Sequence, residues 1–418
     1  MKRNKKSALA FLLCLSLVFS LLLTGCGPSV QARDLMSGVA PQTVSAQTPS
    51  TGEESAAITD FSLRLFRQST PQGENALLSP LSVLYALAMA ANGARGETLI
   101  QMEQTLSLSV ETLNQTLYAY RDALPQGDKA RLSLANSIWL RDTPSLTVEP
   151  SFLQTNTDYY GAAVFSAPFD DSTVRDINRW VKEETEGMIP EILEEISPDT
   201  VAYLINALSF DGEWETVYKK EQIQTGPFTM EDGTVRQVEL MYSSEHQYLE
   251  DENVSGFLKY YAGGDYAFAA LLPREGLSVA DYLSTLTGES LSTLLANPVE
   301  TTVYAAIPKF ELDDELELKG ALSAMGMTDL FDPGLADLSG LGSSDSGNLY
   351  IDSVLHKTTI TVDEKGTRAG AVTSLAVNDS AAPLQPKTVY LDRPFVFLLV
   401  DCRAQLPLFL GTVMDPES

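Results

Sequence analysis

The segment from Asp363 to Val377 constrains the fold of this chain more than any other. It follows a strand-like run, His356–Val362, and it consists largely of small or β-tolerant residues with no apolar stripe at helical spacing. Composition alone is equally typical of a flexible surface loop. As a strand, however, it would place Thr367 and Leu375 on one face and the charged Arg368 on the other. Such a loop, lying beside an existing strand, can become an extra strand of that sheet.

The N-terminus carries the features of an export signal. Basic residues between Lys2 and Lys6 precede an apolar run, Ala8–Leu23, which is short for a membrane-spanning helix and typical of a secretory leader. The run ends in Leu-Thr-Gly-Cys26, which resembles the bacterial lipobox. Residues 1–25 are therefore predicted to be a signal peptide, and Cys26 is predicted to be the lipid attachment site. The protein would be exported and anchored to a membrane, facing the cell surface or the periplasm.

The rest of the chain is expected to form a tether and one domain. Residues 26–54 are rich in Ser, Thr, Pro and Gln and are predicted to be a flexible tether, followed by a single domain over 55–418. Cys14 leaves with the leader, so Cys402 is the only thiol left and no disulfide is available.

Hydrophobic periodicity predicts an α+β protein with large mixed or antiparallel sheets. A helix is expected to begin at Pro80, with Ser79 as its N-cap. Further helices are expected after Gly96, over Asp176–Glu184 and over Asp313–Met325. Strands are expected over seven runs: Leu134–Leu140, Ala202–Phe210, Tyr266–Leu272, Thr301–Ile307, His356–Val362, Phe395–Val400 and Leu408–Val413.

Charge and histidine content exclude several functions. The net charge of −28 repels phosphate backbones, so no nucleic acid partner is expected. The chain has two histidines, His246 and His356, and His246 lies in a polar, turn-like stretch, Ser243–His246. Neither is accompanied by a Gly-x-Ser-x-Gly motif. The sequence therefore argues against an enzyme, and no metal or cofactor is expected.

Several motifs, in order along the chain, resemble those of the serpins. The resemblance covers roughly Ile58 to Pro416 and is strong because the motifs occur together. They are Asn75–Ser82 (NALLSPLS), Ile177–Val181 with Thr185–Ile189, Leu204–Ala207 through Phe210–Trp214, Pro308–Phe310, and Leu391–Phe397. The resemblance implies helices packed on large β-sheets with an exposed reactive-centre loop at about 364–387.

The resemblance also implies a function. A serpin inhibits serine proteases irreversibly: the protease cleaves the loop, forms an acyl-enzyme, and is trapped when the loop inserts into the central sheet. The chain would act as a monomer. The alternative is a non-inhibitory serpin-fold protein that acts as a binding or decoy protein at the cell surface. A proline or a charge on the inward face of the hinge would favour that alternative, and neither is present.

Individual residues match the family's functional positions. The hinge where insertion begins would comprise Glu364, Gly366, Thr367, Ala369 and Ala371. A polar cluster that controls the opening of the sheet would comprise Ser79, Ser82, Asn206 and His356, and Trp214 would be the aromatic residue at the top of the sheet. Arg368, Gly370 and Val372 differ from the residues usual in the family, but alternation places all three outward.

The scissile bond is expected within a short part of the loop that lacks Lys and Arg. Counting family positions from Glu364 places cleavage between Ser380 and Ala381, whereas counting back from Pro394 places it near Pro383. The scissile region therefore comprises Val377, Asn378, Asp379, Ser380, Ala381, Ala382 and Pro383. No Lys or Arg lies between Arg368 and Lys387, which disfavours trypsin-like enzymes. Elastase-like or subtilisin-like targets are favoured, with a papain-like cysteine protease as a further candidate.

Overall fold

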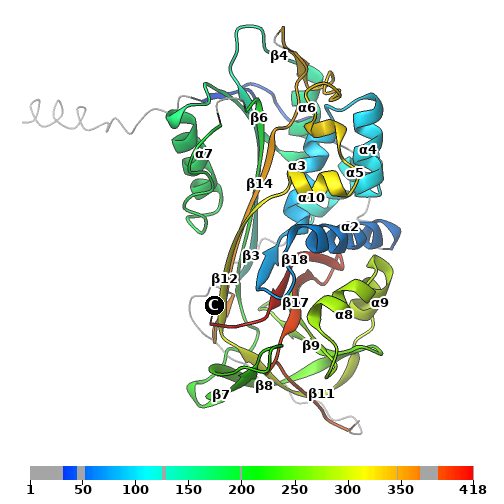
Figure 1. Cartoon of the computed structure of the whole chain (residues 1–418), viewed down its shortest axis with the longest axis vertical. Coiled ribbons are helices and arrows are strands. Elements are labelled where there is room, and N and C mark those ends of the chain that lie inside the picture. Colours follow the sequence, from blue (N-terminus) through cyan, green and yellow to red (C-terminus); the bar gives the residue numbers. More distant parts are fainter. Residues whose placement is uncertain are drawn as a thin grey trace, which may run out of the picture.

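Two large β-sheets and a layer of helices organise the part of this computed structural model that is described, residues 32–44, 52–124, 129–197, 200–345, 347–367 and 385–417. In Figure 1 a long sheet runs along the molecule, helices cover one face of its upper half, and the second sheet packs at its lower end. Helix α7 lies on the opposite face of the long sheet (Figure 1). The α+β architecture with large mixed or antiparallel sheets that the sequence predicts is confirmed.

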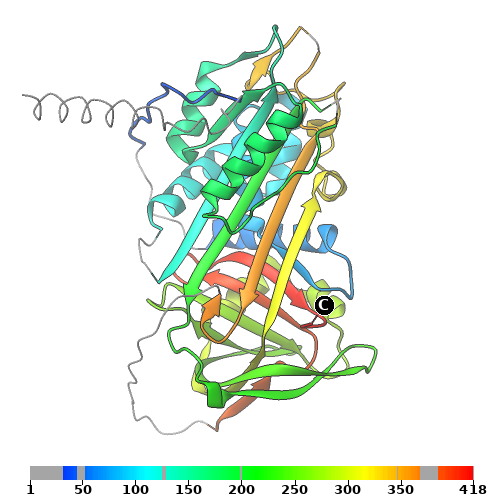
Figure 2. The same cartoon turned by 90° about the vertical axis from the view of Figure 1, so that its left-hand side faces the viewer.

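The long sheet contains seven strands among the described residues. Their spatial order is β1 (Arg33–Asp34), β5 (Ala163–Ala167), β3 (Ala130–Arg141), β6 (Ala202–Glu213), β15 (Gly366–Thr367), β14 (Ser353–Val362) and β12 (Phe310–Glu317). The two central strands, β6 and β14, are parallel to each other. Figure 2 views this sheet face-on and shows the short β15 between the lower ends of β6 and β14.

The second sheet is built mainly from the C-terminal half of the chain. Its order is β16 (Lys387–Tyr390), β11 (Val299–Pro308), β8 (Val235–Glu250), β9 (Val254–Tyr260), β10 (Tyr266–Pro273), β17 (Phe395–Asp401), β18 (Leu406–Val413) and β2 (Ala76–Leu78), with β7 (Ile223–Thr229) paired to β8. A small separate ribbon joins β4 (Thr147–Val148) and β13 (Gly342–Ser343).

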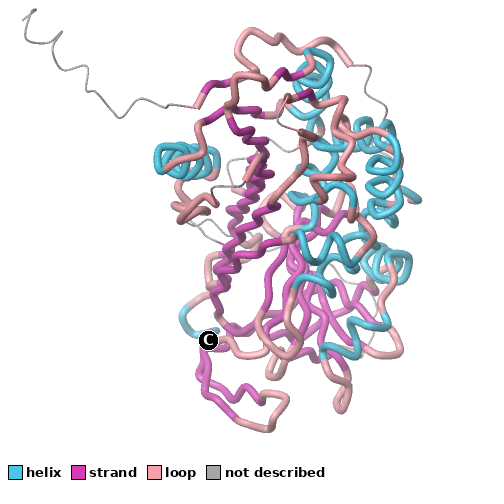
Figure 3. Tube along the Cα trace, turned by 45° about the horizontal axis from the view of Figure 1, so that its top comes forward, coloured by secondary structure: helices cyan, strands magenta, loops and turns pink. Residues whose placement is uncertain are grey.

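Most of the helices cluster on one side of the molecule, and α7 lies apart on the other side, as the colouring by secondary structure shows (Figure 3). Within the described residues, none combines the length and the hydropathy that a transmembrane span needs. Their bounds are α2 (Glu53–Ser69), α3 (Pro80–Ala91), α4 (Gly96–Leu106), α5 (Val110–Asp122), α6 (Pro150–Tyr160), α7 (Asp171–Glu184), α8 (Val279–Thr285), α9 (Gly288–Ala296) and α10 (Lys319–Ala324).

Helix α3 begins at Pro80 as the sequence predicts, but its environment differs from that of an amphipathic surface helix. All residues from Pro80 to Ala91 are buried. The preceding Ser79 occupies the N-cap position, yet its side chain caps nothing. Its hydroxyl donates instead to the carbonyl of Leu408 at 2.9 Å. The helix is stabilised by burial on every side, so the side chain of Ser79 is available for another role.

The predicted helix over Asp313–Met325 is wrong in its first half. Residues Phe310–Glu317 form β12, which pairs with β14 from Phe310 opposite Val362 to Glu317 opposite Leu355. Only Lys319–Ala324 is helical. The apolar residues at 310, 312 and 316 fit a strand as well as a helix, and long-range pairing decides between the two. The strands that the sequence predicts are all present, with wider bounds.

The expectation of a turn at Ser243–His246 is also wrong. These residues lie inside β8, a strand of 16 residues that pairs with β7, β9 and β11. The segment is polar because the side chains of Ser244 and His246 are exposed on this strand. Polar residues on the solvent face of a sheet resemble a turn when only composition is considered.

Part of the expected tether, residues 32–44, lies against the fold. Strand β1 pairs with the edge strand β5, with Arg33 opposite Ser166, and the backbone N–H of Ala32 donates to Asp176 Oδ2 on α7 at 3.0 Å. Through β5 and β3, this segment reaches the end of the sheet where β6 begins at Ala202. Strand β15 lies beside the other end of β6, where Gly366 is opposite Glu213.

Candidate functional site

The candidate site lies where β6 and β14 separate. The two strands pair in parallel over residues 203–207 of β6 and 353–357 of β14. In the described chain this pairing stops at Ala207 and Lys357 and does not continue toward the loop. Instead, β15 lies between the two strands, with Gly366 opposite Glu213 of β6 and Thr367 opposite Val362 of β14. Both new pairings are antiparallel. The long sheet therefore already contains the first residues of the loop, at the point where an additional strand would enter.

The two hinge residues in β15 have the properties that this position requires. Thr367 is only 2% exposed, and its hydroxyl shares a hydrogen bond with the hydroxyl of Tyr261. A Cβ atom on Gly366 would overlap the carbonyl oxygen of Gly212, so the close approach of the two strands requires glycine. Of the residues predicted to face inward, Thr367 is described, and its side chain is buried in the sheet.

The turn that leads into β15 is held by backbone and side-chain hydrogen bonds. Trp214 donates its indole N–H to the carbonyl of Asp363 at 2.9 Å and its backbone N–H to the carbonyl of Lys365 at 2.8 Å. The backbone N–H of Tyr218 donates to the carbonyl of Glu364 at 2.9 Å. We refer to Asp363–Lys365 as the loop root. Trp214 therefore lies at the place expected for it and binds the loop root directly.

An ion pair holds the outer side of the loop root. Lys309 Nζ lies 2.9 Å from Glu364 Oε2 and 3.3 Å from Glu239 Oε2. The hydrogen bond from Lys309 lowers the pKa of Glu364, which keeps this carboxylate charged. Both side chains are partly exposed, so the pair is screened by solvent and contributes modestly to stability.

The four residues of the predicted polar cluster come together in the buried layer beneath the central strands. His356 Nε2 accepts from the backbone N–H of Ser79 at 3.0 Å, and His356 Nδ1 is hydrogen-bonded to Asn206 Oδ1. Ser82 donates to the same Asn206 oxygen at 3.2 Å, and the Asn206 amide donates to the carbonyl of Leu355 on β14 at 3.2 Å. All four side chains are fully buried. The cluster therefore connects helix α3 to both β6 and β14.

The ring of His356 is neutral in this environment. Burial without a nearby carboxylate lowers its pKa to about 3. With Nε2 accepting from Ser79, the proton resides on Nδ1 and is donated to Asn206. The ring is used on both sides for structural hydrogen bonds, which argues against a role as a catalytic base.

Several predicted residues lie outside the described part of the chain. They are the hinge followers Ala369 and Ala371, the scissile region Val377–Pro383, and Cys26. Among the hinge residues, Glu364, Gly366 and Thr367 are described.

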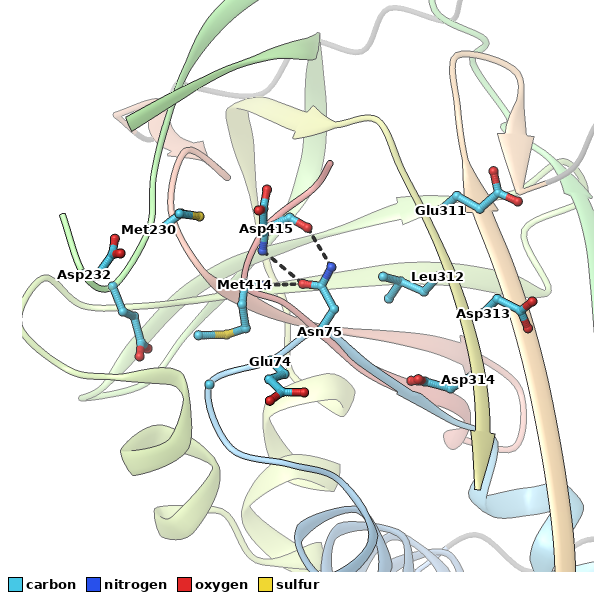
Figure 4. Close-up of a pocket in the computed structure, with 12 residues that line it drawn as sticks. Glu74, Asn75, Met230, Asp232, Glu311, Leu312, Asp313, Asp314, Met414 and Asp415 are labelled. Carbon is cyan, nitrogen blue, oxygen red and sulfur yellow. Dashed lines mark hydrogen bonds between the residues drawn. The ribbon is translucent and has the colours of Figure 1, made fainter. Parts of the chain in front are cut away.

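A separate cleft of about 660 Å³ lies between β12, the chain around Asn75 and the C-terminus. Figure 4 shows the amide of Asn75 holding the backbone of Met414 and Asp415, which explains why an asparagine begins the NALLSPLS motif. Most of the other lining residues are acidic. Even so, nowhere in the described residues do three or more His, Cys, Asp or Glu side chains lie close enough together to hold a metal ion.

Sequence reasoning missed Tyr261 and Lys309, although both contact the hinge or the loop root. Lys309 lies inside the Pro-Lys-Phe motif, which marked the family but not the role of the lysine. Tyr261 directly follows strand β9 and stacks on Trp214 with ring centroids 4.4 Å apart. The sequence carried no signal for this contact because the two residues are distant in the chain.

Helices packed on large β-sheets are the architecture that the resemblance to serpins implied. A family model described as "Serpin (serine protease inhibitor)" matches residues 56–416. The chain therefore belongs to the serpin family.

Individual relatives support this assignment. The chain is 32% identical to Iripin-8 of Ixodes ricinus, with 81% of this chain and 87% of the relative covered. It is 31% identical to leukocyte elastase inhibitor A of Mus musculus, with 87% and 99% covered. The crystal structure of a thermophilic serpin, Tengpin, in the native state superposes with a TM-score of 0.87 at 48% identity, with 92% of this chain and 100% of that chain covered. The crystal structure of Tengpin in the latent state gives a TM-score of 0.77 at 47% identity, with 88% of this chain and 99% of that chain covered.

Proposed function

We propose that this protein is an irreversible, single-use inhibitor of serine proteases that acts by loop insertion. The observation that carries the proposal is the position of β15. Gly366 and Thr367 already pair with β6 and β14 in the antiparallel sense that a complete inserted strand would have. The next loop residues could continue this pairing along the facing edges of β6 and β14.

The energetics favour insertion once the loop is cut. The intact loop is joined to β16 in the second sheet, which restrains how far it can move into the long sheet. Cleavage removes this restraint. A strand of about a dozen residues then gains several ladder hydrogen bonds, each contributing about 0.5–1.5 kcal/mol. Their sum can oppose the cost of distorting an attached protease, so the acyl-enzyme would not be hydrolysed.

The proposed targets are elastase-like or subtilisin-like serine proteases. The residues predicted around the scissile bond are small or aliphatic, among them Val377, Ser380 and Ala381. One relative is by its name an inhibitor of leukocyte elastase. A protease with a small or apolar specificity pocket would accept this sequence, whereas a trypsin-like pocket requires a cation.

Incubation with an elastase-like protease should leave a covalent complex that persists on a denaturing gel. A protease whose catalytic serine is replaced by alanine is the control, because it cannot form the acyl bond. Cleaving the loop with a protease that is not trapped should raise the melting temperature by tens of degrees, since the cut loop completes the sheet. A cleaved loop with neither complex nor increased melting temperature would contradict the proposal and favour a binding or decoy protein.

We further propose that the protein is exported and anchored through a lipid on Cys26. The basic and apolar segments of residues 1–25, followed by Leu-Thr-Gly-Cys, support this location. Metabolic labelling with a radioactive fatty acid tests it, because Cys26→Ser should abolish the label while the protein is still synthesised.

A further inference from the structure

Lys259 is a buried lysine in β9 that loop insertion, as described so far, does not use. Its side chain is 3% exposed, and its ammonium lies 2.9 Å from Glu245 Oε1 on the neighbouring strand β8. Burial lowers the pKa of Lys259, but the attraction of Tyr218 and Glu245 raises it by more, so the ammonium stays charged. A buried charge is costly, so its contacts are informative about its role.

The remaining contacts of Lys259 converge on one short segment. The ammonium lies 4.4 Å from the ring centroid of Tyr218 and 5.3 Å from that of Trp214, both within the range of cation–π attraction. It also donates to the carbonyl of Thr216 at 3.5 Å. The ammonium of Lys259 thus contacts Trp214 and Tyr218 at the two ends of segment 214–218 and Thr216 in its middle.

These same residues hold the loop root. The backbone N–H groups of Trp214 and Tyr218 donate to the carbonyls of Lys365 and Glu364, and the indole of Trp214 donates to Asp363. Segment 214–218 therefore has Lys259 on one side and the loop root on the other. If this segment moves, the hydrogen bonds that fix the turn before β15 are lost.

A second connection reaches the inserted hinge residue itself. Trp214 stacks nearly parallel on Tyr261, with ring planes 18° apart, and the hydroxyl of Tyr261 is bonded to Thr367. Lys259 therefore contacts Trp214, which holds the loop root. Through Trp214 it is also connected to Tyr261, which is bonded to Thr367. The connection consists of direct contacts throughout, so displacement of one ring would displace the next.

We propose that Lys259 and Glu245 form a positioning pair that keeps the loop root and β15 ready for insertion. The pair would thereby set how often a cleaved loop inserts before the acyl-enzyme is hydrolysed. This inference rests on the proposed inhibitory function. With the pair intact, the first pairs of the new strand are already formed at the moment of cleavage, which removes a slow starting step. Without it, residues 366 and 367 leave the sheet more often and the protease escapes more often.

The test compares three variants of the full chain. Lys259→Met removes the charge but keeps the length of the side chain. Lys259→Met with Glu245→Met removes both charges, so no unpaired carboxylate is left, and such replacements of buried ion pairs are often neutral for stability. Lys259→Arg keeps a cation and should rescue function. Lys319→Met is the matched control, because Lys319 pairs with Asp352 at 3.6 Å beside the opposite end of β14.

The first measurement is the number of inhibitor molecules consumed per protease molecule trapped. We expect the ratio of hydrolysed to trapped acyl-enzyme, which is this number minus one, to rise about fivefold in both methionine variants, the factor that a change of about 1 kcal/mol between competing barriers produces. It should stay near the wild-type value in Lys259→Arg and Lys319→Met. A wild-type value in the double variant would overturn the proposal. A purely stabilising role would instead predict recovery in the double variant together with recovery of its melting temperature.

The second measurement needs no protease and is therefore independent of the proposed function. Hydrogen exchange of peptides that contain Trp214, Tyr218 and Thr367 should be about fivefold faster in Lys259→Met than in the wild type, because these amides are released more often. Exchange in β18, in the core of the second sheet, serves as the internal reference. Unchanged exchange at the loop root would overturn the proposal even if inhibition were reduced. If the wild type traps no protease, the proposed function fails, and exchange alone decides whether the pair positions the root.

Discussion

Replacement of Thr367 by arginine is expected to convert the protein from an inhibitor into a substrate of its target protease. Thr367 is 2% exposed between β6 and β14 and bonds the hydroxyl of Tyr261. A guanidinium is too long for this space, and its burial without a partner costs several kcal/mol. Insertion would therefore be slower than hydrolysis of the acyl-enzyme. The ratio of hydrolysed to trapped acyl-enzyme, which is the number of inhibitor molecules consumed per trapped protease minus one, should rise by about tenfold or more, since about 1.4 kcal/mol is sufficient for that factor.

The matched control is Thr367→Val, which keeps the size of the side chain and removes only the hydrogen bond to Tyr261. This variant should still form the covalent complex, because one such bond contributes about 1 kcal/mol. After loop cleavage, the melting temperature of Thr367→Val should rise as in the wild type, whereas that of Thr367→Arg should not. Efficient trapping by Thr367→Arg would show that residue 367 does not enter the sheet.

Acidification is expected to destabilise the native protein through His356. Its pKa is about 3 in the folded protein, against 6.5 as the ordinary value for an exposed histidine. Between pH 6.5 and 3, the unfolded chain therefore binds a proton that the folded chain does not. The free energy of unfolding should fall as the pH falls through this range, by up to about 1.4 kcal/mol per pH unit from this group. Above pH 6.5 the contribution of His356 is constant.

Chemical denaturation at several pH values checks this expectation. His356→Asn should lower stability at pH 7, because it disturbs the hydrogen bonds of Ser79 and Asn206, but its pH dependence should be flatter by one proton. His246→Asn is the control, since His246 is exposed on β8 and is the only other histidine of the chain. Equal slopes in the wild type and His356→Asn would mean that the buried ring is not the group that titrates.

Much of the fold was predictable because its central strands carry local signals. The segments that became β6 and β17 are almost continuously buried, and β14 is rich in β-branched residues and alternates buried with half-buried positions, so the strand type of all three was clear. β12 was mistaken for a helix because its identity depends on pairing with β14. β8 was missed because its exposed face is polar. In both cases the deciding interaction is between residues that are distant in the chain.

The candidate site was predicted to a different extent. The polar cluster followed only from the resemblance to serpins, since Ser79 and His356 are 277 positions apart and no spacing rule connects them. The partial insertion of β15 could not be predicted, because it depends on the exact register of three strands. Lys259 did leave a signal, a charged residue within the buried part of strand Val254–Tyr260, but the sequence alone does not show which rings it contacts.

The N-terminal segment and the loop root lie at opposite ends of β6. The 11 steps between its 12 residues, at about 3.3 Å each, separate these ends by roughly 36 Å. A lipid on Cys26 would hold the molecule by the end where Ala32 meets α7. The loop root would then face away from the bilayer, toward the medium. A soluble protease could approach that end of the molecule without contacting the membrane.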